Sequence, residues 1–142
     1  MGIAGLHKMI ASCVHEVELS TYSGQKIAVD ASCWLHRGAF ACPLELAAGE
    51  PTDKFLGYSE RMIDLMRQHG VTPLLVFDGA PPAMKTRLND ERRAQRTQHR
   101  ARAEALLAEG KRQEAVSAMT KAISVKPHMT QQLIELLRQR GV

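Results

Sequence analysis

The sequence is short of cysteine and has no long hydrophobic run. Its three cysteines, Cys13, Cys33 and Cys42, are an odd number without close pairing, which indicates a reducing environment rather than a disulfide framework. No set of cysteines and histidines has the spacing of a zinc site. The absence of a run of about 18 apolar residues excludes a transmembrane helix. Residues 1–8 also lack the basic-then-apolar pattern of a secretory signal.

What the chain does have is the size of one ordinary domain and a local excess of positive charge. It has 142 residues, of which 44% are hydrophobic, and a net charge of +4. This content supports a core and argues against global disorder. Residues 83–102 carry seven basic and two acidic side chains, a charge of +5, so the rest of the chain sums to −1. The basic residues are Lys85, Arg87, Arg92, Arg93, Arg96, Arg100 and Arg102.

The pattern of apolar residues predicts an α/β fold. Residues 25–30 and 72–79 each contain an apolar run that ends in an acid, which is typical of short buried strands. Between them, Thr52 can cap a helix over residues 53–69, and Gly70 can end it. A strand–helix–strand unit of this kind is almost always right-handed and gives parallel strands.

Three further helices are predicted after the second strand. The first, from residue 83 to about 109, has Ala94 as its only apolar residue between 89 and 100. A helix that is polar all round cannot dock by burial, so this segment either stands in solvent or binds a partner. Helices over about 111–123, and from Thr130 on, follow it. Residues 109–127 also resemble a single tetratricopeptide repeat, but such a fold needs about three copies, so an ordinary helical hairpin is the better interpretation.

A five-residue motif occurs twice in the sequence. Residues 67–71 lead from the first helix into the second strand, and residues 138–142 are identical to them at four of five positions. By the same logic a third strand should begin after residue 142. We therefore expect the chain to end within a fold.

Two aspartates stand at corresponding places, since Asp30 and Asp78 each follow a predicted parallel strand. Ligands of open α/β sheets bind outside this edge, and carboxylate oxygens suit hard cations. A two-metal nuclease would need more than two such acids. The competing interpretation is that each acid is a turn residue or a helix cap, as in Asp78-Gly79.

Lys85, Arg92, Arg96 and Arg100 fall on one helical face because they are spaced by seven, four and four residues,. Guanidinium groups in a row suit phosphates, although a solvated charged face remains the alternative. Among other residues, Trp34 is expected to be a core anchor and Cys33 to pack inside. His36 is either a helix-surface residue or a DNA contact.

Four segments together resemble the flap-endonuclease/exonuclease-1 family of structure-specific 5′ nucleases, the exonuclease-1 branch in particular. They are residues 1–6, 29–38, 49–53 and 69–79. The resemblance implies a PIN-like 5′-nuclease fold, an α/β parallel sheet with flanking helices and a basic helical arch, incomplete at the C-terminus. In this interpretation residues 1–82 form the strand–helix–strand part, 83–128 the arch, and 129–142 a helix leading into a missing strand.

The resemblance also implies roles for individual residues. Asp30 and Asp78 match magnesium ligands of a site for two Mg²⁺ ions, for which Mn²⁺ could substitute. Lys85 and Arg92 match residues that reach the scissile phosphate. The DNA-binding set is Gly2, His36, Arg93, Arg96 and Arg100. Ser32 departs from the family pattern, which often has an aromatic residue there, and the second acidic block of the family lies beyond residue 142.

The function implied is that of a DNA repair nuclease, a 5′→3′ exonuclease and 5′-flap endonuclease that acts by two-metal hydrolysis. Its expected partners are DNA with 5′ ends, nicks, gaps or flaps and, by the same resemblance, mismatch-repair proteins, with the nucleus as its location. The segment is expected to be inactive alone. The alternative is a truncated, non-catalytic DNA-binding or protein-interaction module.

Overall fold

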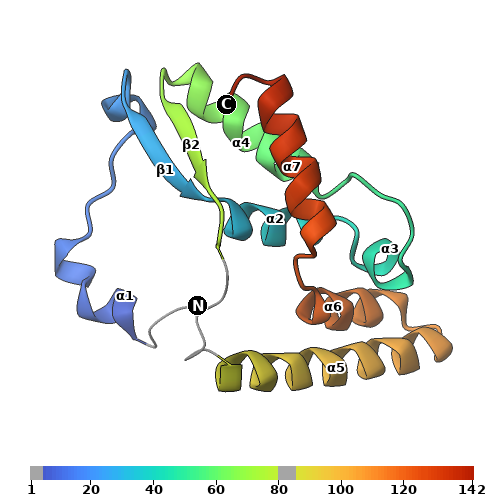
Figure 1. Cartoon of the computed structure of the whole chain (residues 1–142). Coiled ribbons are helices and arrows are strands. Elements are labelled where there is room, and N and C mark those ends of the chain that lie inside the picture. The colour runs from blue at the N-terminus through green and yellow to red at the C-terminus, as the bar shows by residue number, and fades with distance from the viewer. Residues whose placement is uncertain (1–4, 80–85) are drawn as a thin grey trace.

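The computed structural model describes residues 5–79 and 86–142, with side chains from residue 89 onward in the second range. Two strands and a set of helices alternate along the chain (Figure 1). The elements are α1 (Leu6–Met9), η1 (Ala11–Cys13), η2 (Leu19–Tyr22), β1 (Lys26–Asp30), α2 (Ala31–Ala39), α3 (Pro43–Ala48), α4 (Leu56–Gln68), β2 (Thr72–Val76), α5 (Thr86–Ala108), α6 (Arg112–Ala122) and α7 (Pro127–Gln139).

The two strands pair in parallel, with Lys26 opposite Thr72 and Asp30 opposite Val76. This confirms the predicted strand–helix–strand unit, in which α4 connects the strands. The sequence predicts buried strands, but each strand in the structure is buried on one side only. Pro73 is buried, whereas Leu74 and Val76 are 55% and 52% exposed. Side chains alternate along a strand, so one face of the sheet packs on the core and the other lies open.

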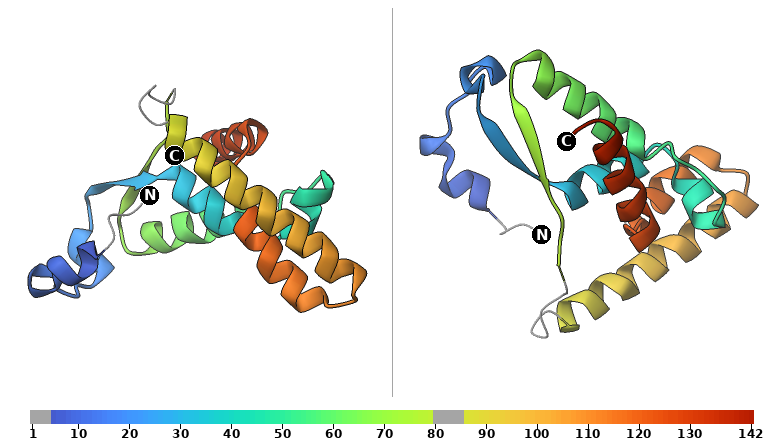
Figure 2. Two further views of the ribbon diagram at one scale, coloured as in Figure 1. Left: turned by 90° about the horizontal axis from the view of Figure 1, so that it is seen from below. Right: turned by 45° about the horizontal axis from the view of Figure 1, so that its top comes forward.

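The main core lies between α2, α4 and α7. Its largest fully buried side chains include Phe55, Leu35, Ile63 and Leu133. Trp34 is 8% exposed and packs edge-on against Tyr58 at a ring distance of 6.4 Å, which confirms it as a core anchor. The side-by-side course of α4 and α7 is visible in Figures 1 and 2.

Two predicted helix starts are wrong. The first crossover helix begins at Leu56 rather than residue 53, and the Thr52 hydroxyl accepts the backbone N–H of Lys54 at 3.4 Å in the loop before it. The last helix begins at Pro127, three residues before Thr130. Proline is well suited to the first helical position because an N–H group there would have no acceptor within the helix, so its absence costs no hydrogen bond.

The repeated motif forms the same turn twice. Gly70 and Gly141 both adopt a left-handed conformation, with φ of 74° and 66°. Each is followed by a valine whose N–H bonds back into the preceding helix, Val71 to Met66 O at 2.9 Å and Val142 to Leu137 O at 3.0 Å. This is the hydrogen bond of a Schellman C-cap.

Two arginines tie these helix ends together. Arg67 Nη2 on α4 donates to the carbonyls of Arg140 and Gly141 at 2.8 and 3.2 Å. In return, Arg140 Nη1 lies 2.7 Å from Asp64 on α4. These contacts hold the C-terminal ends of α4 and α7 next to each other.

Helices α5 and α6 form a hairpin, which we call the arch (residues 86–122). Its own small cluster of buried residues comprises Ala103, Ala118 and Met119, against which Leu44 and Ala47 of α3 also pack. Figures 1 and 2 show α6 along the C-terminal part of α5, whose N-terminal part extends beyond α6. Only the C-terminal part of α5 thus docks by burial. Over the described ranges, no helix combines the length and hydrophobicity needed to cross a bilayer.

Candidate metal centre and nucleic-acid interface

Asp30 and Asp78 meet at the carboxyl edge of the sheet. Asp30 ends β1 opposite Val76, and Asp78 follows Val76 by two residues. Both are exposed, and both line an open depression. This strand-end depression is formed by Ala28, Val29, Asp30, Val76, Phe77 and Asp78.

Asp30 is also the N-cap of α2. Its Oδ1 accepts the backbone N–H of Cys33 at 3.1 Å, and its Oδ2 accepts the Cys33 Sγ–H at 3.0 Å. These bonds, first of all the one from the thiol, hold the pKa of the Asp30 carboxyl below its usual range,. The same contact, burial and the charges of both aspartates raise the pKa of the Cys33 thiol. The helix-cap and metal-ligand interpretations therefore describe the same side chain.

Ser32 links the second aspartate to the same helix. Its hydroxyl donates to Asp78 Oδ2 at 2.7 Å. Sequence reasoning had treated Ser32 only as a departure from the family pattern, and had placed Cys33 inside the protein. Cys33 is in fact exposed. The signal that could have found both residues is their place in the first helical turn after a capping aspartate, where side chains lie beside the strand ends.

The donor set suits a hard cation but is small. Each carboxylate keeps acceptor positions beyond the hydrogen bonds it receives, and oxygen is the ligand atom that Mg²⁺ and Mn²⁺ prefer. Within residues 5–79 and 86–142, no group of three or more histidine, cysteine or acidic side chains could hold a metal ion. Two aspartates can contribute to a metal centre, but a pair of ions needs further ligands.

The basic stripe of Lys85, Arg92, Arg96 and Arg100 is described from Arg92 onward. Arg92 and Arg96 are half-buried, whereas Arg100 is exposed, as is Arg93 beside the stripe. The N-terminal end of α5 lies on the side where β1 and β2 end (Figures 1 and 2). The predicted contacts Gly2 and Lys85 lie outside the described residues.

His36 lies where α2 meets the arch. Its ring packs edge-on against Phe40 at a centroid distance of 5.2 Å. Burial and the nearby charge of Arg96 lower the pKa of His36, while a hydrogen bond with the backbone of Ile123 acts in the opposite direction. His36 is therefore an exposed residue of α2 that lies near one arginine of the basic stripe.

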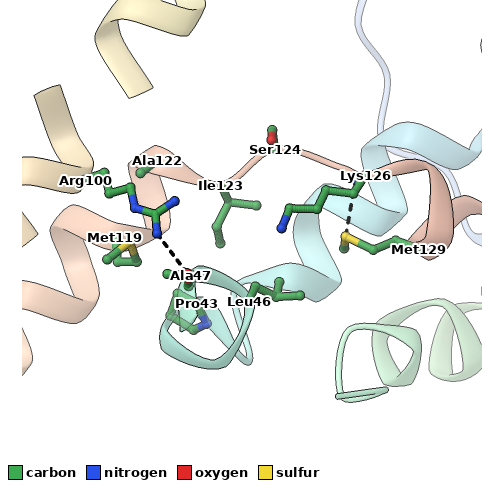
Figure 3. A pocket seen from close by; sticks show the side chains of 10 residues that line it. All are labelled: Pro43, Leu46, Ala47, Arg100, Met119, Ala122, Ile123, Ser124, Lys126 and Met129. Atoms are coloured by element: carbon green, nitrogen blue, oxygen red, sulfur yellow. Dashed lines mark hydrogen bonds between the residues drawn. The ribbon is translucent and has the colours of Figure 1, made fainter. Parts of the chain in front are cut away.

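Arg100 attaches α5 to α3. Its Nη2 donates to the carbonyl of Ala47 at 3.0 Å, and its Nε pairs with Glu104 at 3.1 Å. Figure 3 shows the guanidinium at a pocket between α3, α6 and the start of α7, with Ile123 and Met129 among its lining residues. That Arg100 binds DNA stays a prediction; in the structure its Nη2 and Nε donors already make contacts within the protein.

Comparison with known proteins decides the family. The XPG N-terminal domain matches residues 1–99. The chain belongs to this family.

Members named exonuclease 1 are similar over the whole chain. The identity is 39% with exonuclease 1 of Danio rerio, 37% with that of Arabidopsis thaliana and 35% with exodeoxyribonuclease 1 of Saccharomyces cerevisiae, in each case over 100% of this chain and 18%, 19% and 20% of the relative. The chain therefore spans about a fifth of the length of these relatives. The predicted resemblance to the N-terminal region of exonuclease 1 is confirmed.

The XPG N-terminal domain assignment agrees with the small parallel sheet and flanking helices, so the predicted PIN-like fold is confirmed. It also places the chain in a family of structure-specific 5′ nucleases. The matched segment contains Asp30, Asp78, Arg92, Arg93 and Arg96. Arg100 lies just beyond it.

Proposed function

We propose that the chain supplies part of the active site of a magnesium-dependent DNA repair nuclease that acts as a 5′→3′ exonuclease and 5′-flap endonuclease. The observation that carries the proposal is the meeting of Asp30 and Asp78 at one edge of the sheet, joined through the first turn of α2. The relatives named exonuclease 1 support the reaction class. Mismatch-repair partners and a nuclear location belong to the same proposal.

Each group has a chemical task in this proposal. Asp30 and Asp78 hold magnesium, which when bound activates water and stabilises the leaving oxygen. Arg92, together with Lys85, stabilises the charge that builds up on the scissile phosphate. Arg96 and Arg93 hold the DNA backbone by charge-assisted hydrogen bonds.

The decisive test uses Asp30→Asn and Asp78→Asn rather than alanine variants. Because Asp30 caps α2, Asp30→Ala would weaken the helix as well as the site, whereas asparagine caps about equally well. In a longer form of the protein that cleaves DNA, we expect each variant to lose magnesium-dependent cleavage of a recessed or flapped duplex while keeping its unfolding temperature and DNA affinity. Asp53→Asn, an exposed carboxylate in the loop before α4, is the matched control. Near-normal turnover by either site variant would overturn the proposal.

The arch arginines should separate cleavage from binding. Arg92→Ala is expected to slow single-turnover cleavage by about 10²–10³-fold, the usual cost of one transition-state donor. Arg96→Ala should mainly weaken binding and reduce the slope of log affinity against log salt by about 0.9, as expected for one lost phosphate contact. Equal effects of the two variants on cleavage and on the salt slope would contradict this division of roles.

A second candidate is DNA binding without efficient cleavage by residues 1–142 alone. Two aspartates supply few ligands for two ions, while the +5 segment still attracts phosphates,. We expect this polypeptide to bind DNA weakly, to lose that binding steeply as salt rises, and to cut poorly. Efficient cleavage by residues 1–142 would show that its own ligands suffice.

A further inference from the structure

The two aspartates of the strand-end depression are held differently. Asp30 is the last residue of a paired strand and receives both the backbone N–H and the thiol of Cys33. Asp78 lies two residues past the end of β2, beyond the ladder. Within the part of the chain that the structure describes, its carboxylate accepts a hydrogen bond from Ser32, which lies 46 positions earlier in the sequence.

We propose that Ser32 is a positioning residue that fixes the Asp78 carboxylate for metal binding. The inference rests on the proposed function of Asp30 and Asp78. The bond is short, at 2.7 Å, and joins a neutral hydroxyl to a carboxylate, which is a strong class of hydrogen bond. A donor of this kind fixes the rotamer of a ligand before the cation arrives.

The placement of Ser32 makes it suited to this task. It is the second residue of α2, and the next residue, Cys33, holds Asp30 through two contacts. One helical turn therefore holds both carboxylates, and α2 itself is anchored by the buried side chains of Ala31, Trp34 and Leu35. Movement of Asp78 relative to Asp30 is limited by the rigidity of a single turn.

The first measurement needs no metal. Unfolding equilibria of the wild type, Ser32→Ala, Asp78→Ala and the double variant form a double-mutant cycle in metal-free buffer. Coupling of about threefold or more in the unfolding constant is expected for two side chains in contact. Additive effects would show that the bond does not exist in solution and would overturn the proposal.

The second measurement is the affinity of the whole 142-residue chain for Mn²⁺, followed by its electron paramagnetic resonance signal. Ser32→Ala is expected to raise the Kd about tenfold, the lower end of the effect of removing a donor to a metal ligand. Ser32→Thr keeps the hydroxyl and should restore near-wild-type affinity. Ser117→Ala, an exposed serine on α6, is the control and should change nothing.

The outcomes separate the two proposals. If the wild type binds Mn²⁺ and Asp78→Ala does not, the metal site stands, and equal affinity of Ser32→Ala and wild type would then overturn the positioning role alone. If the wild type itself shows no binding that depends on Asp30 and Asp78, the proposed metal site fails and the role of Ser32 fails with it. If the metal-free cycle shows coupling but Ser32→Ala leaves the Kd for Mn²⁺ unchanged, Ser32 has a structural role only and the positioning role is overturned.

Discussion

Gly38 sets how closely α2 approaches the start of α4. A Cβ atom at this position would overlap the backbone carbonyl of Phe55, and backbone cannot give way as a flexible side chain can. We expect Gly38→Ala to lower the free energy of unfolding by about 1–3 kcal/mol, as overpacking does. Gly57→Ala on α4 is the matched control because its Cβ would meet only the end of Arg61 at 3.5 Å, so better helix propensity should make it neutral or stabilising. Denaturant unfolding of both variants distinguishes them.

His36 should make the stability of the protein depend on pH. Its pKa is lowered in the folded state by burial and by Arg96, so between its folded pKa and the ordinary value near 6.5 the unfolded chain binds more protons. Stability should therefore fall as pH drops below about 6.5 and stay unaffected by this group above that value. His36→Gln should remove this part of the pH dependence, and Arg96→Gln should weaken it. The measurement is the free energy of unfolding of all three proteins at pH 5, 6 and 7.5. The same pH dependence in all three would contradict the role of His36.

At the residue scale, the acids were predictable and their partners were not. Asp30 and Asp78 stand out because each follows an apolar run, a pattern that lies within a few residues of sequence,. The bond from Ser32 to Asp78 spans 46 positions, and that from Arg100 to Ala47 spans 53. Contacts of this kind depend on how helices pack, which periodicity does not reveal.

At the scale of elements, Arg100 is expected to hold the arch against α3. Arg100→Ala loses the bond to Ala47 O and the pair with Glu104, so amide hydrogen exchange in α5 should become faster. Arg102→Ala, on the same helix and exposed, should leave exchange unchanged and only weaken DNA binding. If both variants exchange like the wild type, the contact with α3 does not restrain the arch.

The sequence predicted the long helices and misplaced their starts for a physical reason. Periodic apolar residues mark α4 and α7. The start of a helix depends instead on which backbone N–H groups the nearby side chains bind. The hydroxyl of Thr52 serves the loop instead of the helix, and α3 (Pro43–Ala48) is too short to show a period. The half-open sheet escaped prediction as well, because an apolar run does not tell whether both faces are covered.

At the scale of the whole molecule, the open face of the sheet is an expected site of self-association. Leu74 and Val76 expose about half of their surface there, and the two-stranded sheet has unpaired edges,. We expect the 142-residue chain to associate as its concentration rises. The double variant Leu74→Thr and Val76→Thr should reduce this association while keeping strand propensity. Sedimentation velocity across a concentration series is the measurement, and a wild type that stays monomeric throughout would contradict the expectation.

The position of Asp30 at the start of α2 bears on whether the chain can fold before it binds a metal ion. The N-terminus of a helix carries a partial positive charge of about half a unit, and here it lies beside two carboxylates that would otherwise repel each other. In many small metal-dependent domains, the chain stays unfolded until the ion arrives, because the free energy of metal binding is needed for folding. In this protein the helix itself offsets that repulsion. If the proposed site holds a metal ion, folding and metal loading should therefore be separable steps, and a chelator should empty the site while the chain stays folded.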